Sequence, residues 1–171
     1  MSKRLLLLML LISIVTSSLF AQNFTFSGSN THSVMICSNG NVFAWGKNNI
    51  GQLGVQSDGV TPNTGTYSST PVRVYGMSPI FSVDAGSGAH TLAMTCDGKV
   101  YAWGQNSSGE LGNSTLPTTY SAKPYLVMAG ATASLSGTTA TDPLINITSV
   151  SGGNTTSYAV YKAPNGTSYA I

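Results

Sequence analysis

The stretch VFAWGKNNIGQLG, residues Val42 to Gly54, returns 58 positions later as VYAWGQNSSGELG, residues Val100 to Gly112, without a gap. When the comparison is extended to residues 32–54 and 90–112, ten of the twenty-three positions are identical. Similarity at a constant spacing of this length is typical of stacked supersecondary units, each of which buries its apolar face against a neighbour. The repeat therefore predicts a row of similar structural units.

Eight of the identical positions carry turn and packing residues, and we assign them to the framework of the repeat. In the first copy they are His32, Gly40, Trp45, Gly46, Asn48, Gly51, Leu53 and Gly54, and in the second copy His90, Gly98, Trp103, Gly104, Asn106, Gly109, Leu111 and Gly112.

Each copy has the pattern of a group of β-strands. The runs HSVMIC and HTLAMT favour strands, and the Asn-Gly and Asp-Gly pairs that follow supply the positive φ angles of a tight hairpin turn. In the returning strands VFAWG and VYAWG, the aromatic residue and the tryptophan lie on one face, which needs a neighbouring sheet to cover it. Further strands are predicted at PVRVY and PYLVM, each beginning at its proline, Pro71 or Pro124, and at IFSV and INITSV.

Residues 147–171 form the start of a third copy. INITSVSGG parallels IFSVDAG, and SYAVYKAPNGTSYAI parallels TLAMTCDGKVYAW when two residues near Ala163 and Pro164 are treated as inserted. This alignment puts Thr156 or Ser157 in the histidine column and Ile171 in the tryptophan column. The small-residue stretch at 129–143 is typical of a low-complexity surface insertion.

The N-terminus and the composition indicate an exported protein. Lys3 and Arg4 precede the apolar run LLLLMLLISIV, which predicts a secretory signal peptide over residues 1–21, cleaved after Ala21 to leave a domain at 22–171. The apolar run is shorter than the roughly 20 residues of a membrane span. Only 7% of the residues are charged, against roughly 25% in typical domains.

Charge also bears on the partner. Without Lys3 and Arg4 the chain has five basic and five acidic side chains, so no basic excess remains for binding nucleic acid. We therefore expect a secreted or cell-surface protein with no membrane span after signal cleavage and no nucleic-acid partner.

The string HTLAMTCDGKVYAWGQNSSGELG resembles the repeat of the regulator of chromosome condensation family, and the resemblance covers nearly everything after the signal except residues 129–143. It implies an all-β fold of four-stranded antiparallel blades from a seven-bladed β-propeller. Two complete repeats and part of a third are too few to close such a ring. We expect the 171 residues to be an N-terminal piece of a longer chain, and the alternative is a ring assembled from several short chains.

Two pairs of residues are candidates for a metal site or a disulfide. His32 and His90 share one repeat column, which favours a framework role over a pair of ligands or bases. Cys37 and Cys96 stand one residue out of register, and this offset disfavours a disulfide between them. Their unequal spacing from the histidines also argues against zinc. We expect no metal site.

Catalytic motifs are equally weak. The segment DAGSGAH, residues Asp84 to His90, lacks the nucleophile-elbow pattern and the lysine of a phosphate-binding loop, so we interpret it as a glycine-rich strand connection. Glu110 stands in the column of Gln52 and is interpreted as a turn residue. We expect no catalytic residue and no cofactor.

The predicted function is a non-catalytic protein-binding or adhesion module, with recognition by the variable loops at 55–70 and 113–122 on a rigid propeller. The partner would be a protein or a surface ligand. One alternative, implied by the resemblance, is guanine-nucleotide exchange on a small nuclear GTPase, which predicted export and balanced charge oppose. Another is a secreted enzyme, for which the acidic side chains in hand are few: Asp58, Asp84, Asp97, Glu110 and Asp142.

Overall fold

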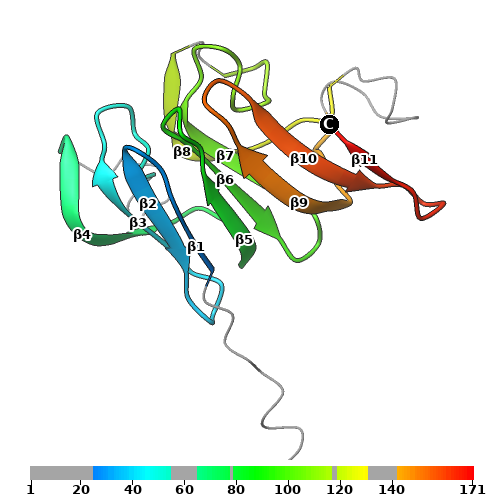
Figure 1. Cartoon of the computed structure of the whole chain (residues 1–171), viewed down its shortest axis with the longest axis horizontal. Coiled ribbons are helices and arrows are strands. Elements are labelled where there is room, and N and C mark those ends of the chain that lie inside the picture. The colour runs from blue at the N-terminus through cyan, green and yellow to red at the C-terminus, as the bar shows by residue number, and fades with distance from the viewer. Residues whose placement is uncertain (1–24, 55–64, 78, 117–118, 131–141) are drawn as a thin grey trace, which may run out of the picture.

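A computed structural model describes residues 25–54, 65–77, 79–116, 119–130 and 142–171, and the predicted signal peptide lies outside these ranges. Within them, every regular element is a β-strand, and the strands form three antiparallel sheets that follow one another along the chain (Figure 1). The predicted all-β class, with two four-stranded units and part of a third, is confirmed. The described part of the chain has no helix long and apolar enough to cross a membrane.

The sheets have a simple up-and-down order. The first contains β1 (Thr25–Gly28), β2 (His32–Ile36), β3 (Val42–Lys47) and β4 (Tyr67–Val74), and the second contains β5 (Ile80–Ala85), β6 (His90–Thr95), β7 (Val100–Gln105) and β8 (Tyr120–Leu126). The third contains β9 (Ile147–Gly152), β10 (Ser157–Lys162) and β11 (Ser168–Ala170), in the order β11-β10-β9.

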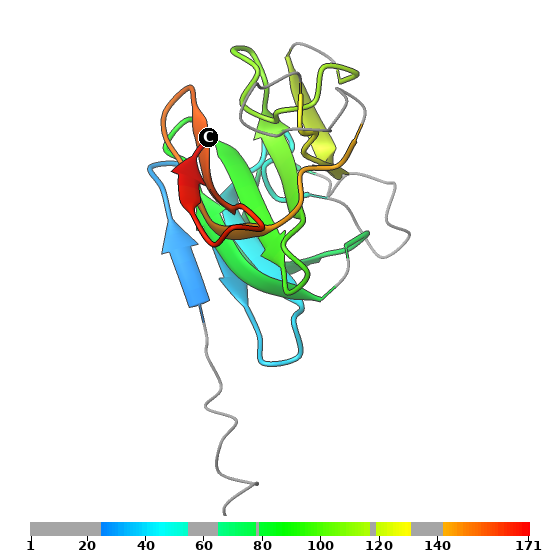
Figure 2. The ribbon, with the colours of Figure 1, turned by 90° about the vertical axis from the view of Figure 1, so that its right-hand side faces the viewer.

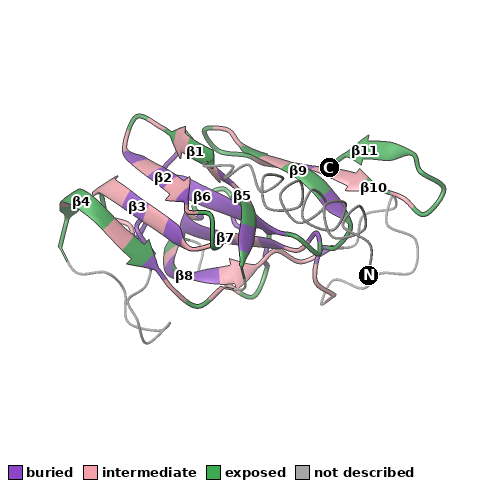
Figure 3. Cartoon of the chain, turned by 90° about the horizontal axis from the view of Figure 1, so that it is seen from below, coloured by how far each residue is buried: buried purple, intermediate pink, exposed green. Residues whose placement is uncertain are grey.

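The sheets pack face against face in chain order. Strand β5 contacts β1 and β2, and β9 contacts β5 and β6; in the side view of Figure 2 the third sheet, in orange and red, lies in front of the other two. The middle sheet is therefore covered on both faces, and β6 is buried along its whole length (Figure 3). Strands β1 and β11 are largely exposed. Stacking of the repeats, rather than a core inside each sheet, buries the apolar side chains.

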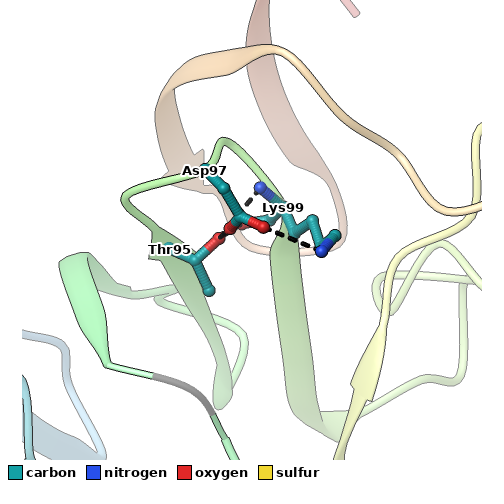
Figure 4. A network of polar contacts seen from close by, with 3 residues as sticks. All are labelled: Thr95, Asp97 and Lys99. Carbon is teal, nitrogen blue, oxygen red and sulfur yellow. Dashed lines mark hydrogen bonds and ion pairs between the residues drawn. The ribbon is translucent and has the colours of Figure 1, made fainter.

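The hairpin turns use glycine for the left-handed backbone. Gly40 has a φ of 76° and Gly98 a φ of 74°, whereas the preceding Asn39 and Asp97 do not have positive φ. The expectation that both residues of each pair supply positive φ was therefore wrong, and the geometry fits a type I turn followed by a left-handed glycine. In the second turn the Asp97 carboxylate accepts a hydrogen bond from the Thr95 hydroxyl and pairs with Lys99 Nζ at 2.7 Å (Figure 4).

Pro71 and Pro124 do not begin strands, as the sequence pattern had predicted. Strand β4 begins four residues before Pro71 and β8 four residues before Pro124. Both strands are sheet edges, and each proline lies where the register with the neighbouring strand shifts. A bulge in an edge strand tolerates proline because no ladder hydrogen bond needs its missing N–H.

The third sheet has a longer hairpin than the alignment predicted. The pairing with β9 puts Ala159 in the place that Ala93 has in the second sheet. Ala159 exchanges backbone hydrogen bonds of 2.8 and 2.9 Å with Ile171, whereas Ala93 pairs with Tyr101. Ile171 therefore stands in the column of Tyr101 and not in that of Trp103, because the hairpin has four extra residues rather than two.

The described ends of the insertion at 129–143 are ordered by backbone pairing. Met128 and Pro143 form an antiparallel bridge, Ala129 N donates to Asp142 O at 2.8 Å, and Leu144 N donates to Val127 O at 2.8 Å. Ala129 is buried. The packed stem thus includes residues that the composition had placed in the insertion, and residues 131–141 lie outside the described ranges.

Candidate functional site

The first repeated polar contact joins His32 to the next sheet. The His32 side chain is buried, and its Nε2 lies 2.7 Å from Thr91 Oγ1 on β6. On the other side of the ring, Nδ1 lies 3.1 Å from both the Ser29 and the Thr31 hydroxyl oxygens. Both ring nitrogens of His32 are therefore occupied by hydroxyl groups, two from its own sheet and one from the second sheet.

The second histidine makes the equivalent contact with the third sheet. His90 Nε2 lies 3.1 Å from Ser157 Oγ, which donates a hydrogen bond of 2.6 Å to the Glu110 carbonyl oxygen. Since the serine proton is directed at that carbonyl, His90 Nε2 carries the hydrogen and donates to the serine oxygen. The strand register aligns Ser157 with Thr91, so Thr156 takes the histidine column. His90 Nδ1 is buried without a hydrogen-bond partner among the described residues.

Burial sets the protonation of both rings. Desolvation lowers the pKa of His32 to about 4, and the neighbouring His90 acts in the same direction. Desolvation also lowers the pKa of His90, although the carboxylates of Glu110 and Asp84 oppose this. Both imidazoles are therefore neutral at pH 7 and serve as hydrogen-bonding groups between sheets. No group of three or more His, Cys, Asp or Glu side chains among the described residues is placed to hold a metal ion.

Asp84 joins all three sheets. From β5, its Oδ1 accepts a hydrogen bond of 2.5 Å from Ser27 Oγ on β1, and its Oδ2 accepts one of 2.7 Å from Gly152 N on β9. Ser27 Oγ in turn accepts from Ala85 N at 3.1 Å. The carboxylate thus lies within the segment that the sequence indicated as a strand connection, but its role as a bridge was not predicted.

Replacing Asp84 with alanine should lower the free energy of unfolding by about 1–3 kcal/mol, because the Gly152 amide and the Ser27 hydroxyl lose their acceptor. Urea denaturation followed by circular dichroism measures the change. Asp97→Ala is the matched control, since Asp97 makes only an exposed local pair and its loss should leave the midpoint unchanged. Equal midpoints for the two variants would show that the bridge between sheets contributes nothing.

Gln52 and Glu110 occupy equivalent buried positions in the turns after β3 and β7. Gln52 Oε1 accepts from Ile50 N at 3.1 Å, and Glu110 Oε2 accepts from Ser108 N at 2.8 Å. Glu110 Oε1 also accepts from Gln105 Nε2 at 3.1 Å. The carboxylate of Glu110 therefore organises a turn, in agreement with the interpretation from the sequence.

The loops predicted to carry recognition start and end in identical stems. Asn48 N donates to Thr66 O at 2.7 Å, and Asn106 N donates to Thr119 O at 2.9 Å. Each asparagine Oδ1 also accepts from the backbone N–H five residues later, at 3.0 and 3.1 Å. Between these stems the first loop is five residues longer than the second. Residues 55–64, which include Asp58, and residues 117–118 lie outside the described ranges.

A tyrosine follows each of these loops at the first position of the outer strand. Tyr67 pairs with Lys47, and Tyr120 pairs with Gln105, so the two tyrosines occupy equivalent places in adjacent sheets. Their exposed fractions are 71% and 47%. We call Tyr67 and Tyr120 the outer-strand tyrosines. The comparison at a spacing of 58 missed them because the unequal loops bring them to a spacing of 53.

The cysteines take no part in this surface. Cys37 is half-buried and Cys96 is exposed, and both are free thiols in the hairpin turns of different sheets. Cys37 donates its backbone N–H to Asn41 as Thr95 does to Lys99, which places Cys37 and Thr95 in one column.

Four-stranded antiparallel sheets packed face to face, with repeated contacts between them, define the class of β-propeller repeat proteins. Comparison with family models identifies the repeat itself. The model described as Regulator of chromosome condensation (RCC1) repeat matches residues 39–94 and 97–160, and a second model with the same description matches residues 82–110. The chain belongs to this family.

Relatives of known sequence and structure agree. Protein pim1 of Schizosaccharomyces pombe is 35% identical over 94 residues, covering 50% of this chain and 17% of pim1, and the human probable E3 ubiquitin-protein ligase HERC3 is 38% identical over 88 residues, covering 50% of this chain and 8% of HERC3. The chain thus spans less than a fifth of the length of these curated relatives.

Solved structures share the fold at low identity. Prp20p of Saccharomyces cerevisiae superposes with a TM-score of 0.64 at 19% identity, over 82% of this chain and 31% of Prp20p. Human WBSCR16 superposes with a TM-score of 0.60 at 20% identity, over 86% of this chain and 33% of WBSCR16.

Proposed function

We propose that this RCC1-repeat chain is a non-catalytic protein-binding module, and that it recognises its partner with the outer-strand tyrosines and the loops beside them. The observation that carries the proposal is the repetition of an exposed tyrosine at the same strand position in two adjacent blades. Tyrosine is enriched in protein interfaces because it offers a large apolar ring together with a polar hydroxyl.

The fate of the polar groups supports the absence of catalysis. The histidines, Asp84 and the Glu110 carboxylate are engaged in contacts between or within blades. A general base needs a free ring nitrogen or carboxylate oxygen within reach of a substrate proton. These groups instead stabilise the stack, and the surface left for recognition is made of loops and tyrosines.

Structural neighbours offer a precedent of type. A solved structure of Prp20p is described together with its binding properties to Gsp1p and histones, and another as Kap60 bound to yeast RCC1. Those partners belong to those proteins. For the present chain they support binding of a protein as the kind of function, while its own partner follows from its own loops.

Site-specific photocrosslinking tests the proposal. In separate variants, Tyr67, Tyr120 and Phe81 are replaced by p-benzoylphenylalanine, and the chains are irradiated in the producing culture. Phe81 is the control, because it is 58% exposed but lies on β5, far along the sheet order from β8. We expect the two tyrosine positions to capture the same protein and Phe81 to capture none. No adduct at either tyrosine, or equal capture at all three positions, would overturn the proposal.

We also propose that the protein acts outside the cell or at its surface. The support is the predicted signal peptide and the low charge of the sequence. N-terminal sequencing of protein recovered from the medium or the cell surface should begin at Gln22. A chain that keeps Met1 and remains with the cell contents would contradict export.

A further inference from the structure

The interface between the first two blades contains a site shaped for an indole ring. Trp103 is fully buried there, and its Nε1 donates a hydrogen bond of 2.9 Å to the Gln52 carbonyl oxygen. Gly54 and Val74 form the adjoining wall: a Cβ on Gly54 would lie 2.5 Å from Val74 Cγ1 and 3.5 Å from Trp103 Nε1. The site thus consists of a backbone carbonyl, a glycine that leaves room, and an apolar wall.

The same three elements recur one blade later. Glu110 is equivalent to Gln52, Gly112 to Gly54, and Val127 to Val74, since a Cβ on Gly112 would lie 2.8 Å from Val127 Cγ1. Here, however, no indole is present. The chain has two tryptophans, Trp45 in the first sheet and Trp103 in the first interface.

A cavity takes the place of the ring. It has a volume of about 330 Å³ and is lined by residues of the second and third sheets, among them Glu110, Gly112, Val127, Leu144 and Val150. This volume is at the lower end of the roughly 300–1,000 Å³ of small-molecule sites. The lining is mainly apolar, as an aromatic ligand requires.

One polar group in the cavity wall can fix the orientation of such a ring. The Glu110 carbonyl oxygen accepts a hydrogen bond from Ser157 Oγ, and a carbonyl has a second lone pair that can accept an indole N–H. In the first interface the equivalent carbonyl accepts from Trp103. Benzene-like rings would fill the space but would leave this acceptor unused.

We propose that the cavity between the second and third blades is an indole-binding site, and that its ligand is a tryptophan side chain from outside the described residues. The site is separate from the outer-strand tyrosines, so that its failure and the failure of the proposed recognition surface are distinguishable.

Fluorine NMR with 5-fluoroindole tests the site on the full chain without interference from Trp45 and Trp103. Line broadening on addition of protein reports binding, and 1-methylindole and indole are compared as unlabelled competitors. We expect indole to compete about fivefold better than 1-methylindole, since methylation removes the N–H that the carbonyl accepts. Equal competition, or no broadening at all, would overturn the proposal.

A pair of variants locates the binding. Ala129 lines the cavity, and Ala129→Leu should fill it and reduce the affinity at least about tenfold. Ala170→Leu is the matched control, because Ala170 is exposed on β11 and outside the lining, and its affinity should match that of the unaltered chain. Equal binding by both variants would place the indole elsewhere. If Ala129→Leu does not fold, as its circular dichroism would reveal, the 1-methylindole comparison still decides.

Discussion

Replacing Trp103 with alanine is expected to lower the free energy of unfolding by about 3–5 kcal/mol, the usual range for removing a large buried aromatic side chain. The indole is fully buried and joins the first two blades, both by packing and by its hydrogen bond to the Gln52 carbonyl. Its loss leaves a cavity at the interface and an acceptor without a donor. Urea denaturation monitored by circular dichroism gives the difference.

Two further variants separate the contributions to this loss. Trp45→Ala removes the equivalent ring of the first blade, which is only half-buried, and should destabilise the chain less. Trp103→Phe keeps an aromatic ring but removes the N–H, and leaves the carbonyl unsatisfied at a cost of about 1–3 kcal/mol. If Trp45→Ala and Trp103→Ala lose the same free energy, burial between blades is not what makes this residue important.

Acidification from pH 7 to pH 4 should destabilise the fold by about 3 kcal/mol through His32 alone. Its pKa is about 4 in the folded chain, against the ordinary histidine value of 6.5 that applies once the chain unfolds, and each unit of difference corresponds to about 1.4 kcal/mol. Since the unfolded chain takes up the proton first, the contribution is present above pH 6.5, declines as the pH falls towards 4, and changes little below that. The lowered pKa of His90 acts in the same direction.

The variant His32→Gln isolates this effect from the titration of carboxylates in the same range. Glutamine keeps a hydrogen-bonding group near Thr91 but does not titrate, so its stability should fall less steeply between pH 6.5 and pH 4. Urea midpoints at four pH values across this interval give the two slopes. Identical slopes for the variant and the unaltered chain would show that His32 is not the responsible group.

Much of the fold was predictable because the repeat states it twice. The hairpins around Gly40 and Gly98, the strands that carry the tryptophans, and the need for a neighbouring sheet all follow from local pattern and period. The structure confirms three sheets stacked in chain order. The errors concern register. A bulge around Pro71 and a longer third hairpin ending at Ile171 depend on pairing between strands, which aligned copies do not report.

The contacts of the candidate sites were less predictable for a related reason. An alignment identifies equivalent residues, whereas the histidines bind hydroxyl groups 59 and 67 positions further along the chain, in the next blade. The bridge made by Asp84 uses a backbone amide 68 positions away and has no counterpart in the first copy, where Ser27 stands. Only the packing of one copy on the next brings these groups together.

The identical loop stems at Asn48 and Asn106 have a consequence for how such a protein can diversify. Because each loop is closed by the same backbone hydrogen bond, its length can vary while the blade keeps its geometry. The entropy of loop closure grows only with the logarithm of length, so the five extra residues of the first loop cost about 0.3 kcal/mol. Mutation and insertion between the stems are therefore almost neutral for stability. Each blade offers a position where foreign peptides can be grafted, and new specificities can arise there without rebuilding the propeller.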